Sequence, residues 1–485
     1  MKKVTSGADL VELSRDAGTV SLAPRAAYFA ESEEDVVSAM RDASAEGLAV
    51  TARGAGTGIP TQSVGRGAIL IQNRKAMELG DDRVACQPGV VKAELNRVLL
   101  PTGRWMPVDT SSYASCTIGG MVANNSSGVR TVKYGSTIDY VRALRMVRAD
   151  GVVRSVSQLP IGQAMSGDET TRKAASLIIE NQSDIQRERP KVTKNSSGYR
   201  LERVLHDEII DLPKLFVGSE GTLGVVTEAT LATLIRPRWK FLLVVESSLE
   251  ELDKTTEAFR RHSPAALELV DKTVFRKVNR WGEISKYSRS ESQYMIFCEF
   301  DGADEDRSSK EEEIAASDLA GLDPLVMQGL SEIQQAWEVR NETLAIAQEI
   351  RRGTKVLVPG VEDLVVPPAR LGDLVRLLAE QLGKRGLEYI VYGHAGDANL
   401  HARPLLDPGD AKDMKMADDL MADCFEAVWR MGGSMSGEHG DGMLRAKYLE
   451  GQYPRTYWVM RELKELYDPK GILNPGVKIA WRLPP

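Results

Sequence analysis

Cysteine and histidine are scarce in this 485-residue chain, which contains four of the first and five of the second. The cysteines (Cys86, Cys116, Cys298 and Cys424) lie far apart, and no two of them form a Cys-x-x-Cys pair. This spacing argues against a zinc ribbon and against an iron–sulfur cluster held by the chain's own thiolates. Buried thiols in a reducing compartment are the simpler interpretation.

Long apolar runs and a surplus of basic residues are also missing. No window approaches the ~18 uninterrupted apolar residues of a membrane-spanning helix, and the first residues lack the apolar core of a signal peptide. The net charge is −7, which gives no basic footprint for nucleic acid. We therefore expect a cytoplasmic protein that does not bind nucleic acid. The length, with 42% hydrophobic and 27% charged residues, predicts two or three globular domains.

A Rossmann dinucleotide fingerprint is absent as well. Residues 32–47 have the N-cap serine, acidic first turn and terminal glycine of a helix, and a short strand is expected at 48–53. The glycines that follow, at positions 54, 56 and 58, read G-x-G-x-G, and Pro60 stands where a crossover helix would begin. Backbone amides beside Arg53 still suit a phosphate. The loop therefore predicts a phosphate cradle in a different fold, with a tight β-turn as the structural alternative.

Two further stretches of the first half are rich in glycine and in small hydroxylated residues. They span residues 107–128 and 215–226. The first has too little bulk to form a core by itself and can wrap closely around an extended polar ligand, with backbone amides and hydroxyls as donors. The glycines of the second indicate a close approach of the backbone to another group. An Asp-Gly hairpin turn is expected at 150–151, after a strand at 141–149.

The sequence changes character near residue 237. From there, strands and helices alternate in a pattern that fits an antiparallel sheet with helices on one side. We expect this second domain, to about residue 450, to bind the substrate. The remaining tail predicts a helix at 456–467 and a proline-punctuated turn, which we expect to dock on the first domain.

Three of the five histidines cluster in residues 392–442, the most informative part of the chain. His394 and His401 flank a Gly-Asp-Ala-Asn turn, so a hairpin could aim both imidazoles at one point. Glu438 lies in a glycine-rich loop and completes a plausible ligand set for a divalent metal. His439 is left free for proton transfer. The alternative is a group of ordinary structural histidines.

These motifs give the chain a family resemblance. Residues 216–224, 393–401, 436–442 and 468–476 resemble the FAD-linked D-2-hydroxyacid dehydrogenases, a group that includes glycolate oxidase D-subunit-like, D-lactate and D-2-hydroxyglutarate dehydrogenases. This group belongs to the vanillyl-alcohol oxidase/para-cresol methylhydroxylase superfamily, and the likeness covers residues 24–478. It implies an α+β fold: a two-part FAD-binding domain at 1–236, an antiparallel-sheet cap domain at 237–450 and a C-terminal segment at 451–485.

The resemblance also implies how FAD is held. No histidine stands in the phosphate loop, so noncovalent FAD is expected. The family's Asn-Ala-Gly-Gly turn reads Asn-Ser-Ser-Gly at 125–128, which keeps its small, donor-rich character. The residues expected to contact FAD are Arg53, Gly54, Ala55, Gly56, Thr57, Gly58, Pro88, Gly89, Pro107, Asp109, Ser115, Thr117, Gly119, Gly120, Asn124, Asn125, Ser127, Tyr134, Gly135, Glu220, Gly221, Gly224, Val225, Val226 and Asn474.

For the reaction centre, the resemblance implies a divalent metal, expected to be zinc, on His394, His401 and Glu438. His439 matches the base, Arg340 the substrate-carboxylate arginine, and Asn399 a position near metal and substrate. In such a reaction FAD takes the hydride, and a histidine that is neutral near pH 7 takes the hydroxyl proton.

The expected function is oxidation of a D-2-hydroxy acid, with a D-lactate-like substrate favoured. A D-2-hydroxyglutarate or glycolate dehydrogenase remains an alternative. A dicarboxylate would need a second cationic anchor, for which Arg351, Arg352 and Lys355 are candidates, although a solvated turn is the favoured interpretation of these three residues. An oxidase that uses O₂, an FAD-binding electron-transfer subunit and a zinc hydrolase also stay open. Expected electron acceptors are a quinone, an electron-transfer flavoprotein or an iron–sulfur subunit. Peripheral binding to the inner membrane face and a homodimer are compatible with the sequence.

Overall fold

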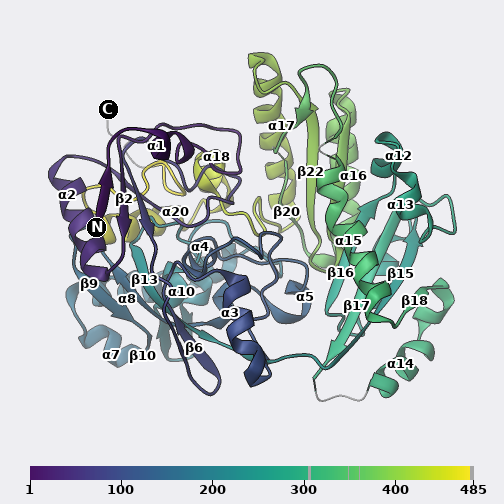
Figure 1. Ribbon diagram of the computed structural model, residues 1–485, viewed down its shortest axis with the longest axis horizontal. Helices are drawn as coiled ribbons and strands as arrows, with labels where there is room; N and C mark the ends of the chain where they lie inside the picture. The colour runs from purple at the N-terminus through teal and green to yellow at the C-terminus, as the bar shows by residue number, and fades with distance from the viewer. Residues whose placement is uncertain (304–306, 348, 360, 481–485) are drawn as a thin grey trace.

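The computed structural model describes residues 1–303, 307–347, 349–359 and 361–480 and forms two lobes (Figure 1). The first lobe, purple to blue in Figure 1, contains the N-terminal half of the chain. The second lobe, teal to green, contains the alternating strands and helices that begin near residue 239. The last helix, α20 (Tyr457–Tyr467), lies back in the first lobe. Among the described residues, no helix is both long and apolar enough to cross a membrane.

One part of the first lobe is a four-stranded sheet that carries the glycine loop. Its order is β1 (Lys2–Val4), β2 (Ala26–Ala30), β4 (Ala68–Gln72) and β3 (Val50–Arg53), with β4 parallel to both β2 and β3. Helix α2 (Glu33–Ala45) packs on this sheet through its apolar face. Ser32 caps α2 in a capping box with Asp35, which confirms the predicted helix start.

The other part of the first lobe is built around a five-stranded antiparallel sheet. Its order is β5 (Met77–Leu79), β6 (Arg83–Cys86), β13 (Val225–Ala232), β8 (Val141–Val147) and β9 (Val153–Val156). The predicted hairpin turn joins β8 to β9, and Gly151 supplies its left-handed residue at φ 76°. Smaller sheets combine β10 (Gln158–Pro160), β12 (Ile209–Asp211) and β11 (Leu205–His206), and β14 (Leu234–Ile235) with β7 (Arg104–Trp105).

The helices of the first lobe are mostly short, in keeping with its many glycine-rich connections. They are α1 (Ala8–Glu12), α3 (Lys92–Leu99), α4 (Ile118–Asn124), α5 (Thr131–Tyr134), α6 (Thr137–Tyr140), α7 (Ile161–Ser166), α8 (Glu169–Glu180), α9 (Gln182–Glu188) and α10 (Pro213–Phe216). Helix α4 lies inside the stretch 107–128, which we expected to be an irregular wrap. Thr117 caps its first turn and Asn125 ends it in the left-handed conformation, which explains how so glycine-rich a segment forms a helix.

The second lobe contains an antiparallel sheet of eight strands. Its order is β18 (Leu325–Met327), β15 (Trp239–Ser247), β17 (Tyr294–Gly302), β16 (Ala266–Asp271), β21 (Tyr389–His394), β22 (Asn399–Leu406) and β19 (Val356–Leu357), and β20 (Leu364–Val365) pairs with β22. The fold class is therefore α+β, as predicted.

Helices cover both faces of this sheet, so the expectation of helices on one side is wrong. Alternate residues of β15 belong to different cores, with Leu243 on one face and Val244 on the other. One core includes residues of α11 (Leu252–Arg260), α14 (Arg307–Ala315), α16 (Leu371–Lys384) and α17 (Ala411–Arg430), and the other includes α12 (Thr273–Lys277), α13 (Trp281–Ser285) and α15 (Leu330–Ala347). The central strands are apolar on both faces, and this continuous apolar pattern is typical of a sheet with helices packed on both faces.

After the short helices α18 (Gly442–Arg445) and α19 (Leu449–Gln452), the chain returns to the first lobe, where residues 473–478 pack against several of its segments. Val50 of β3 forms a bridge with Leu473. Asn474 donates from Nδ2 to the carbonyl oxygens of Gln62 (2.9 Å) and Glu220 (2.7 Å). The fully buried Lys478 ammonium lies 2.7 Å from an Asp441 carboxylate oxygen. Residues 473–478 thus hold together segments far apart in the sequence.

Candidate functional site

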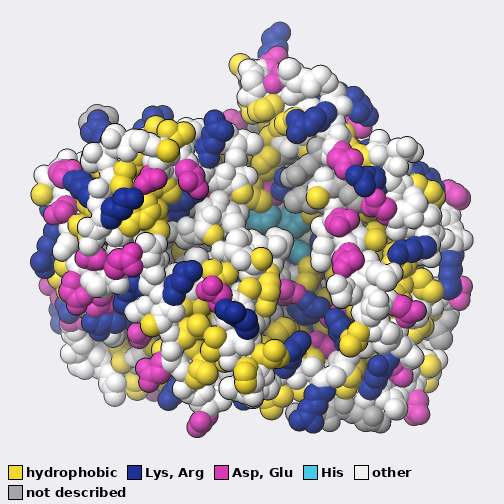
Figure 2. All heavy atoms as spheres, in the orientation of Figure 1, with side chains coloured by type: hydrophobic (Ala, Val, Ile, Leu, Met, Phe, Trp, Pro, Cys, Tyr) yellow, Lys and Arg dark blue, Asp and Glu magenta, His cyan; other side chains and the backbone are white. Residues whose placement is uncertain are grey.

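A cavity of about 1000 Å³ lies where the two lobes meet. The first lobe contributes the glycine loop and the small-residue stretches, and the second contributes α15, β21, β22 and the loop that carries Glu438. Figure 2 shows histidine side chains (cyan) in the hollow between the lobes. The volume lies at the upper end of the range for small-molecule sites. The structure therefore brings the glycine loop and the histidine cluster to one continuous space.

The glycine loop follows β3 and needs its glycines for local reasons. A Cβ on Gly54 would lie 2.6 Å from the Thr117 hydroxyl, and Gly56 has a φ of 70°, where side chains are disfavoured. The Arg53 guanidinium donates to the carbonyl oxygens of Arg15 (2.8 Å) and Ser63 (3.1 Å) and so braces the loop. Backbone without side chains faces the cavity here, which fits the phosphate cradle predicted from the sequence.

Most of the residues predicted to contact FAD line the cavity. They come from the glycine loop, the turn before α3, helix α4 with its flanks, and the loop leading to β13. These residues are Arg53, Gly54, Ala55, Gly56, Thr57, Gly58, Pro88, Gly89, Asp109, Thr117, Gly119, Gly120, Asn124, Ser127, Glu220, Gly221, Gly224, Val225 and Val226.

Six predicted FAD residues do not line the cavity: Pro107, Ser115, Asn125, Tyr134, Gly135 and Asn474. Asn125 accepts a hydrogen bond from the backbone of Ile138 (2.9 Å) and so fixes the end of α4. Tyr134 donates its hydroxyl to Asp301 of the second lobe (2.7 Å). These two, like Asn474, support the wall from behind, a role that the small-residue pattern does not separate from ligand contact.

The β21–β22 hairpin places the histidines as predicted, and the three imidazoles converge on Glu438. Tyr392 pairs with His401 across the hairpin. The Nε2 atoms of His394 and His401 each lie 3.3 Å from Glu438 Oε1, and that of His439 lies 3.4 Å away. The ligand atoms of His394, His401 and Glu438 all lie within 4.8 Å of one another. Two imidazoles and a carboxylate at this spacing fit a divalent cation such as zinc.

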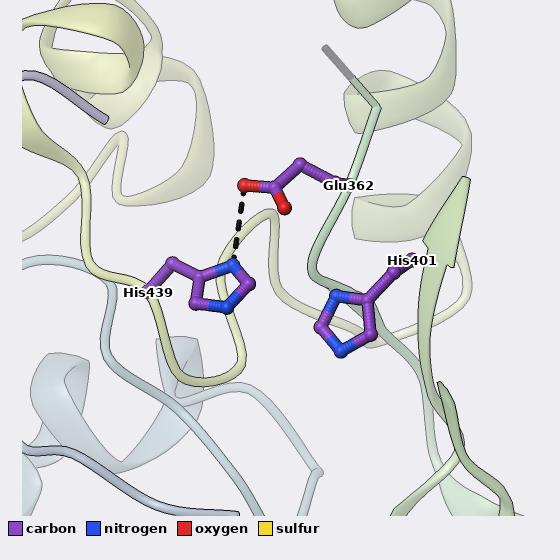
Figure 3. A group of neighbouring side chains, drawn as sticks. All are labelled: Glu362, His401 and His439. Carbon is purple, nitrogen blue, oxygen red and sulfur yellow. Dashed lines mark hydrogen bonds and ion pairs between the residues drawn. The ribbon is translucent and has the colours of Figure 1, made fainter. Parts of the chain in front are cut away.

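Two buried glutamates orient the outer histidines. Glu268 of β16 lies 2.7 Å from His394 Nδ1. Glu362 lies 3.1 Å from His439 Nδ1, and Figure 3 draws this contact beside His401. A carboxylate on Nδ1 fixes the ring and leaves Nε2 for the site. Neither acid was predicted from the sequence. Glu268 had a usable signal, since it is a charge in the middle of an apolar strand, whereas Glu362 resembles any solvated acid before a short strand.

The acids change the protonation of the histidines. Burial lowers the pKa of His439, but Glu362 and Asp363 outweigh it and raise that pKa to about 9. Burial lowers the pKa of His401, so this ring is neutral and suited to ligate a metal. The expectation that His439 is neutral near pH 7 therefore does not hold for the protein chain by itself.

Lys194 is a further charged group of the site, and its role was not predicted from the sequence. Its side chain is fully buried, and its ammonium lies 3.0 Å from Glu438 Oε2. Burial raises the pKa of Glu438, but Lys194 and the histidines outweigh it and hold that pKa well below its usual range. Glu438 is thus an ionised carboxylate with one oxygen on Lys194 and the other facing three imidazoles.

The two remaining residues predicted to contact substrate, Arg340 and Asn399, differ in whether they line the cavity. Arg340 of α15 lines the cavity and forms an ion pair with Glu268. Asn399 does not line the cavity, because at the start of β22 its amide donates to Asp363 Oδ1 (3.1 Å) and to the carbonyl of Leu364. Asp363 in turn accepts the backbone N–H groups of Glu438 and His439, so Asn399 supports their loop.

Comparison with known proteins agrees with this architecture. Residues 24–157 match the family described as FAD binding domain, and residues 237–477 match FAD linked oxidases, C-terminal domain. An alkyldihydroxyacetonephosphate synthase structure has a TM-score of 0.63 over 94% of this chain and 76% of its own, at 17% identity. At that identity the likeness concerns the fold alone.

Three relatives of known name show to which family the chain belongs. The D-lactate dehydrogenase of Archaeoglobus fulgidus is 31% identical, over 95% of this chain and 94% of its own. The glycolate oxidase subunit GlcD of Bacillus subtilis is 28% identical, over 89% and 84%. The D-2-hydroxyglutarate dehydrogenase of Escherichia coli is 29% identical over 97% of this chain, which spans 50% of that relative's length. The chain belongs to the FAD-linked oxidases, in the group that contains the D-2-hydroxyacid dehydrogenases.

Proposed function

We propose that the protein is an FAD-dependent dehydrogenase that oxidises a D-2-hydroxy acid to the 2-oxo acid. The observation that carries this proposal is the convergence of His394, His401, His439 and Glu438 in the cavity that the glycine loop also lines. The relatives named D-lactate dehydrogenase and D-2-hydroxyglutarate dehydrogenase support the substrate class.

In this proposal FAD binds noncovalently in the first-lobe part of the cavity, along the glycine loop, α4 and the start of β13. When bound, FAD supplies the hydride acceptor. The chain divides into an FAD-binding domain at 1–236, a cap domain at 237–450 and a C-terminal segment at 451–485. The cap closes the site from the second lobe.

His394, His401 and Glu438 would hold the divalent cation, with zinc expected. When bound, the cation supplies a Lewis acid that lowers the pKa of the substrate hydroxyl. Glu268 fixes the ring of His394, and Lys194 fixes the carboxylate of Glu438. These contacts keep the ligand atoms in place before any ion arrives.

In this proposal His439 is neutral when the neighbouring site holds its cation, because a like charge disfavours the imidazolium, and it then accepts the hydroxyl proton at Nε2. Its Nδ1 faces Glu362, so Nε2 is the nitrogen that points to the histidine cluster. The Glu362 carboxylate stabilises the imidazolium that forms when the proton arrives. Arg340 holds the substrate carboxylate, for which a guanidinium is well shaped.

Anaerobic bleaching of the flavin tests the proposal. The purified protein should be yellow, and D-2-hydroxy acids should bleach its ~450 nm band, which belongs to the cofactor itself. L-enantiomers should leave the band unchanged, and a chelator should slow the D-acid reaction. A colourless protein would favour a hydrolase. A coloured protein that no 2-hydroxy acid bleaches would favour an electron-transfer subunit, and peroxide formed in air would indicate an oxidase.

Electron acceptors can be ranked in the same assay. A quinone analogue, an electron-transfer flavoprotein and an iron–sulfur partner subunit would each reoxidise the bleached flavin. The acceptor that gives the fastest return of the ~450 nm band is the best candidate.

A further inference from the structure

The three imidazoles stand in a row with matching ends. The ring centroids of His394 and His401 lie 5.4 Å apart, and those of His401 and His439 lie 5.1 Å apart. At each end, the outer histidine meets a buried glutamate through Nδ1. The second oxygen of each glutamate then faces an arginine of the cavity wall: Glu268 faces Arg340, and Glu362 faces Arg403.

Arg340 has an expected role at its end of the row, whereas Arg403 has none. Arg403 lies two residues after His401 on β22, so both side chains project from the same face of the strand. Its guanidinium lies 3.3 Å from Glu362 Oε2. Only 7% of the residue is exposed, yet it lines the cavity.

The need for a positive charge beside Glu362 does not explain why Arg403 is an arginine. The fully buried Arg445 already places its guanidinium 3.2 Å from Glu362 Oε1, and His439 faces that same oxygen. Arg403 is thus a second guanidinium on a carboxylate that already has one. Its Nε is buried and, within the described part of the chain, has no hydrogen-bond partner. The same holds for Nε of Arg340. A buried N–H without a partner is costly, and an anionic ligand would relieve that cost at both ends.

We propose, building on the function proposed above, that Arg403 binds a second carboxylate of the substrate. Arg340 then holds the carboxylate next to the reacting carbon, and Arg403 holds the distal one beyond the histidine row. Guanidinium groups suit carboxylates because their planar N–H forks match the two oxygens. The preferred substrate is therefore a 2-hydroxy dicarboxylate, in place of the lactate-like acid expected from the sequence.

The test compares D-malate and D-2-hydroxyglutarate with D-lactate and D-2-hydroxybutyrate on the FAD-loaded enzyme. The wild type should show a higher kcat/KM for a dicarboxylate. In Arg403→Gln, the ratio of dicarboxylate to monocarboxylate kcat/KM should fall roughly 10–100-fold, mainly through KM. Arg403→Lys keeps the charge but loses the fork, so its ratio should lie in between. Arg430→Gln, on an exposed arginine of α17, is the matched control and should keep the wild-type ratio.

Binding gives a second readout that does not depend on turnover. Perturbation of the oxidised flavin spectrum by 2-oxoglutarate and by pyruvate yields both dissociation constants. Arg403→Gln should weaken 2-oxoglutarate binding roughly 10–100-fold more than pyruvate binding.

Three outcomes would overturn the assignment. One is a wild-type preference for monocarboxylates, which needs no variant. Another is an equal loss on both substrate types in Arg403→Gln, which would make Arg403 a positioning residue that acts through Glu362. The third is an unchanged substrate ratio in Arg403→Gln. Failure of the proposed function would look different, because then no 2-hydroxy acid of either type would bleach the flavin.

Discussion

Glu438 has more partners in the site than any of its predicted fellow ligands. One of its oxygens meets Lys194 and the other faces three imidazoles. In Glu438→Ala we expect bound metal to fall from about one equivalent to near zero, because two neutral imidazoles alone hold a divalent ion weakly. Elemental analysis with flavin absorbance measures both cofactors, and the flavin should stay. Glu426→Ala, on the exposed side of α17, is the control. Full metal retention in Glu438→Ala would contradict the assignment.

His439 should matter for turnover and not for cofactor content. We expect His439→Gln to lower kcat by roughly 10²–10⁴-fold, the usual contribution of a positioned base. Stopped-flow bleaching measures the loss at the chemical step. His262→Gln is a matched control, since His262 pairs with Glu313 away from the cavity and should leave kcat unchanged. Wild-type bleaching rates in His439→Gln would remove His439 from the mechanism.

The convergence of His394, His401 and Glu438 was predictable because histidine is rare in this chain and clusters in one segment. Their partners were harder to find. Glu268 and Glu362 come from segments far away in sequence, and only the packing of β16 and of the loop before β20 brings them to the imidazoles. The same packing raises the pKa of His439, a shift that no local pattern encodes. For Asn399 the prediction failed in the opposite direction. This residue belongs to the 393–401 motif and was expected near the substrate, but its amide donates to Asp363.

At the scale of elements, the glycine loop should be the most sensitive part of the FAD site. Gly56→Ala would place a Cβ 2.2 Å from the Arg53 guanidinium at a φ of 70°. We expect FAD to bind at least ~10-fold more weakly, because the strain of about 1–2 kcal/mol adds to displacement of the bracing arginine. Fluorescence titration of the apoprotein with FAD measures this.

The variant Gly47→Ala is a control that distinguishes the effect of backbone strain on stability from an effect on FAD binding. Gly47 also has a positive φ, 67°, but nothing lies within 4 Å of the position of an added Cβ. This variant should lose about 1 kcal/mol of stability and keep wild-type FAD affinity. Equal FAD affinity in Gly56→Ala and Gly47→Ala would show that the loop does not cradle the cofactor.

Element types were largely predictable, since caps, hairpin turns and apolar spacing are local. Two features were not. Helix α4 forms in a glycine-rich stretch because Thr117 and Asn125 cap it. Helices cover both faces of the second sheet, and which helix lies on which face depends on contacts between distant segments.

At the scale of the whole molecule, a buried ion pair ties the lobes together. Arg130 of the first lobe donates to Glu299 Oε1 (2.7 Å), and Trp337 donates to Glu299 Oε2 (2.7 Å). Burial raises the pKa of Glu299, but Arg130 and Lys240 outweigh it, so that the folded pKa is lowered. The pair's contribution is therefore present above the unfolded pKa of about 4.3 and is lost as pH falls through the folded value.

Glu299→Gln should lower stability at pH 7, by less than the ~3–5 kcal/mol of a fully uncompensated buried charge, because Arg130 keeps its ion pair with Asp109. The difference from wild type should shrink below about pH 4, as the wild-type carboxyl is protonated. Urea midpoints at both pH values measure this. Glu291→Gln, whose carboxylate is 90% exposed, should change little at either pH. A difference that grows in acid would refute the role of the pair.

The packing of residues 473–478 into the first lobe also determines when that lobe can finish folding during protein synthesis. Val50 leaves the ribosome early, but its partner Leu473 emerges more than 400 residues later. Asn474 then clamps Gln62 and Glu220, and Lys478 clamps Asp441. A nascent chain thus carries an open flavin lobe until residues 473–478 have emerged, so capture of the cofactor follows synthesis of the whole second lobe.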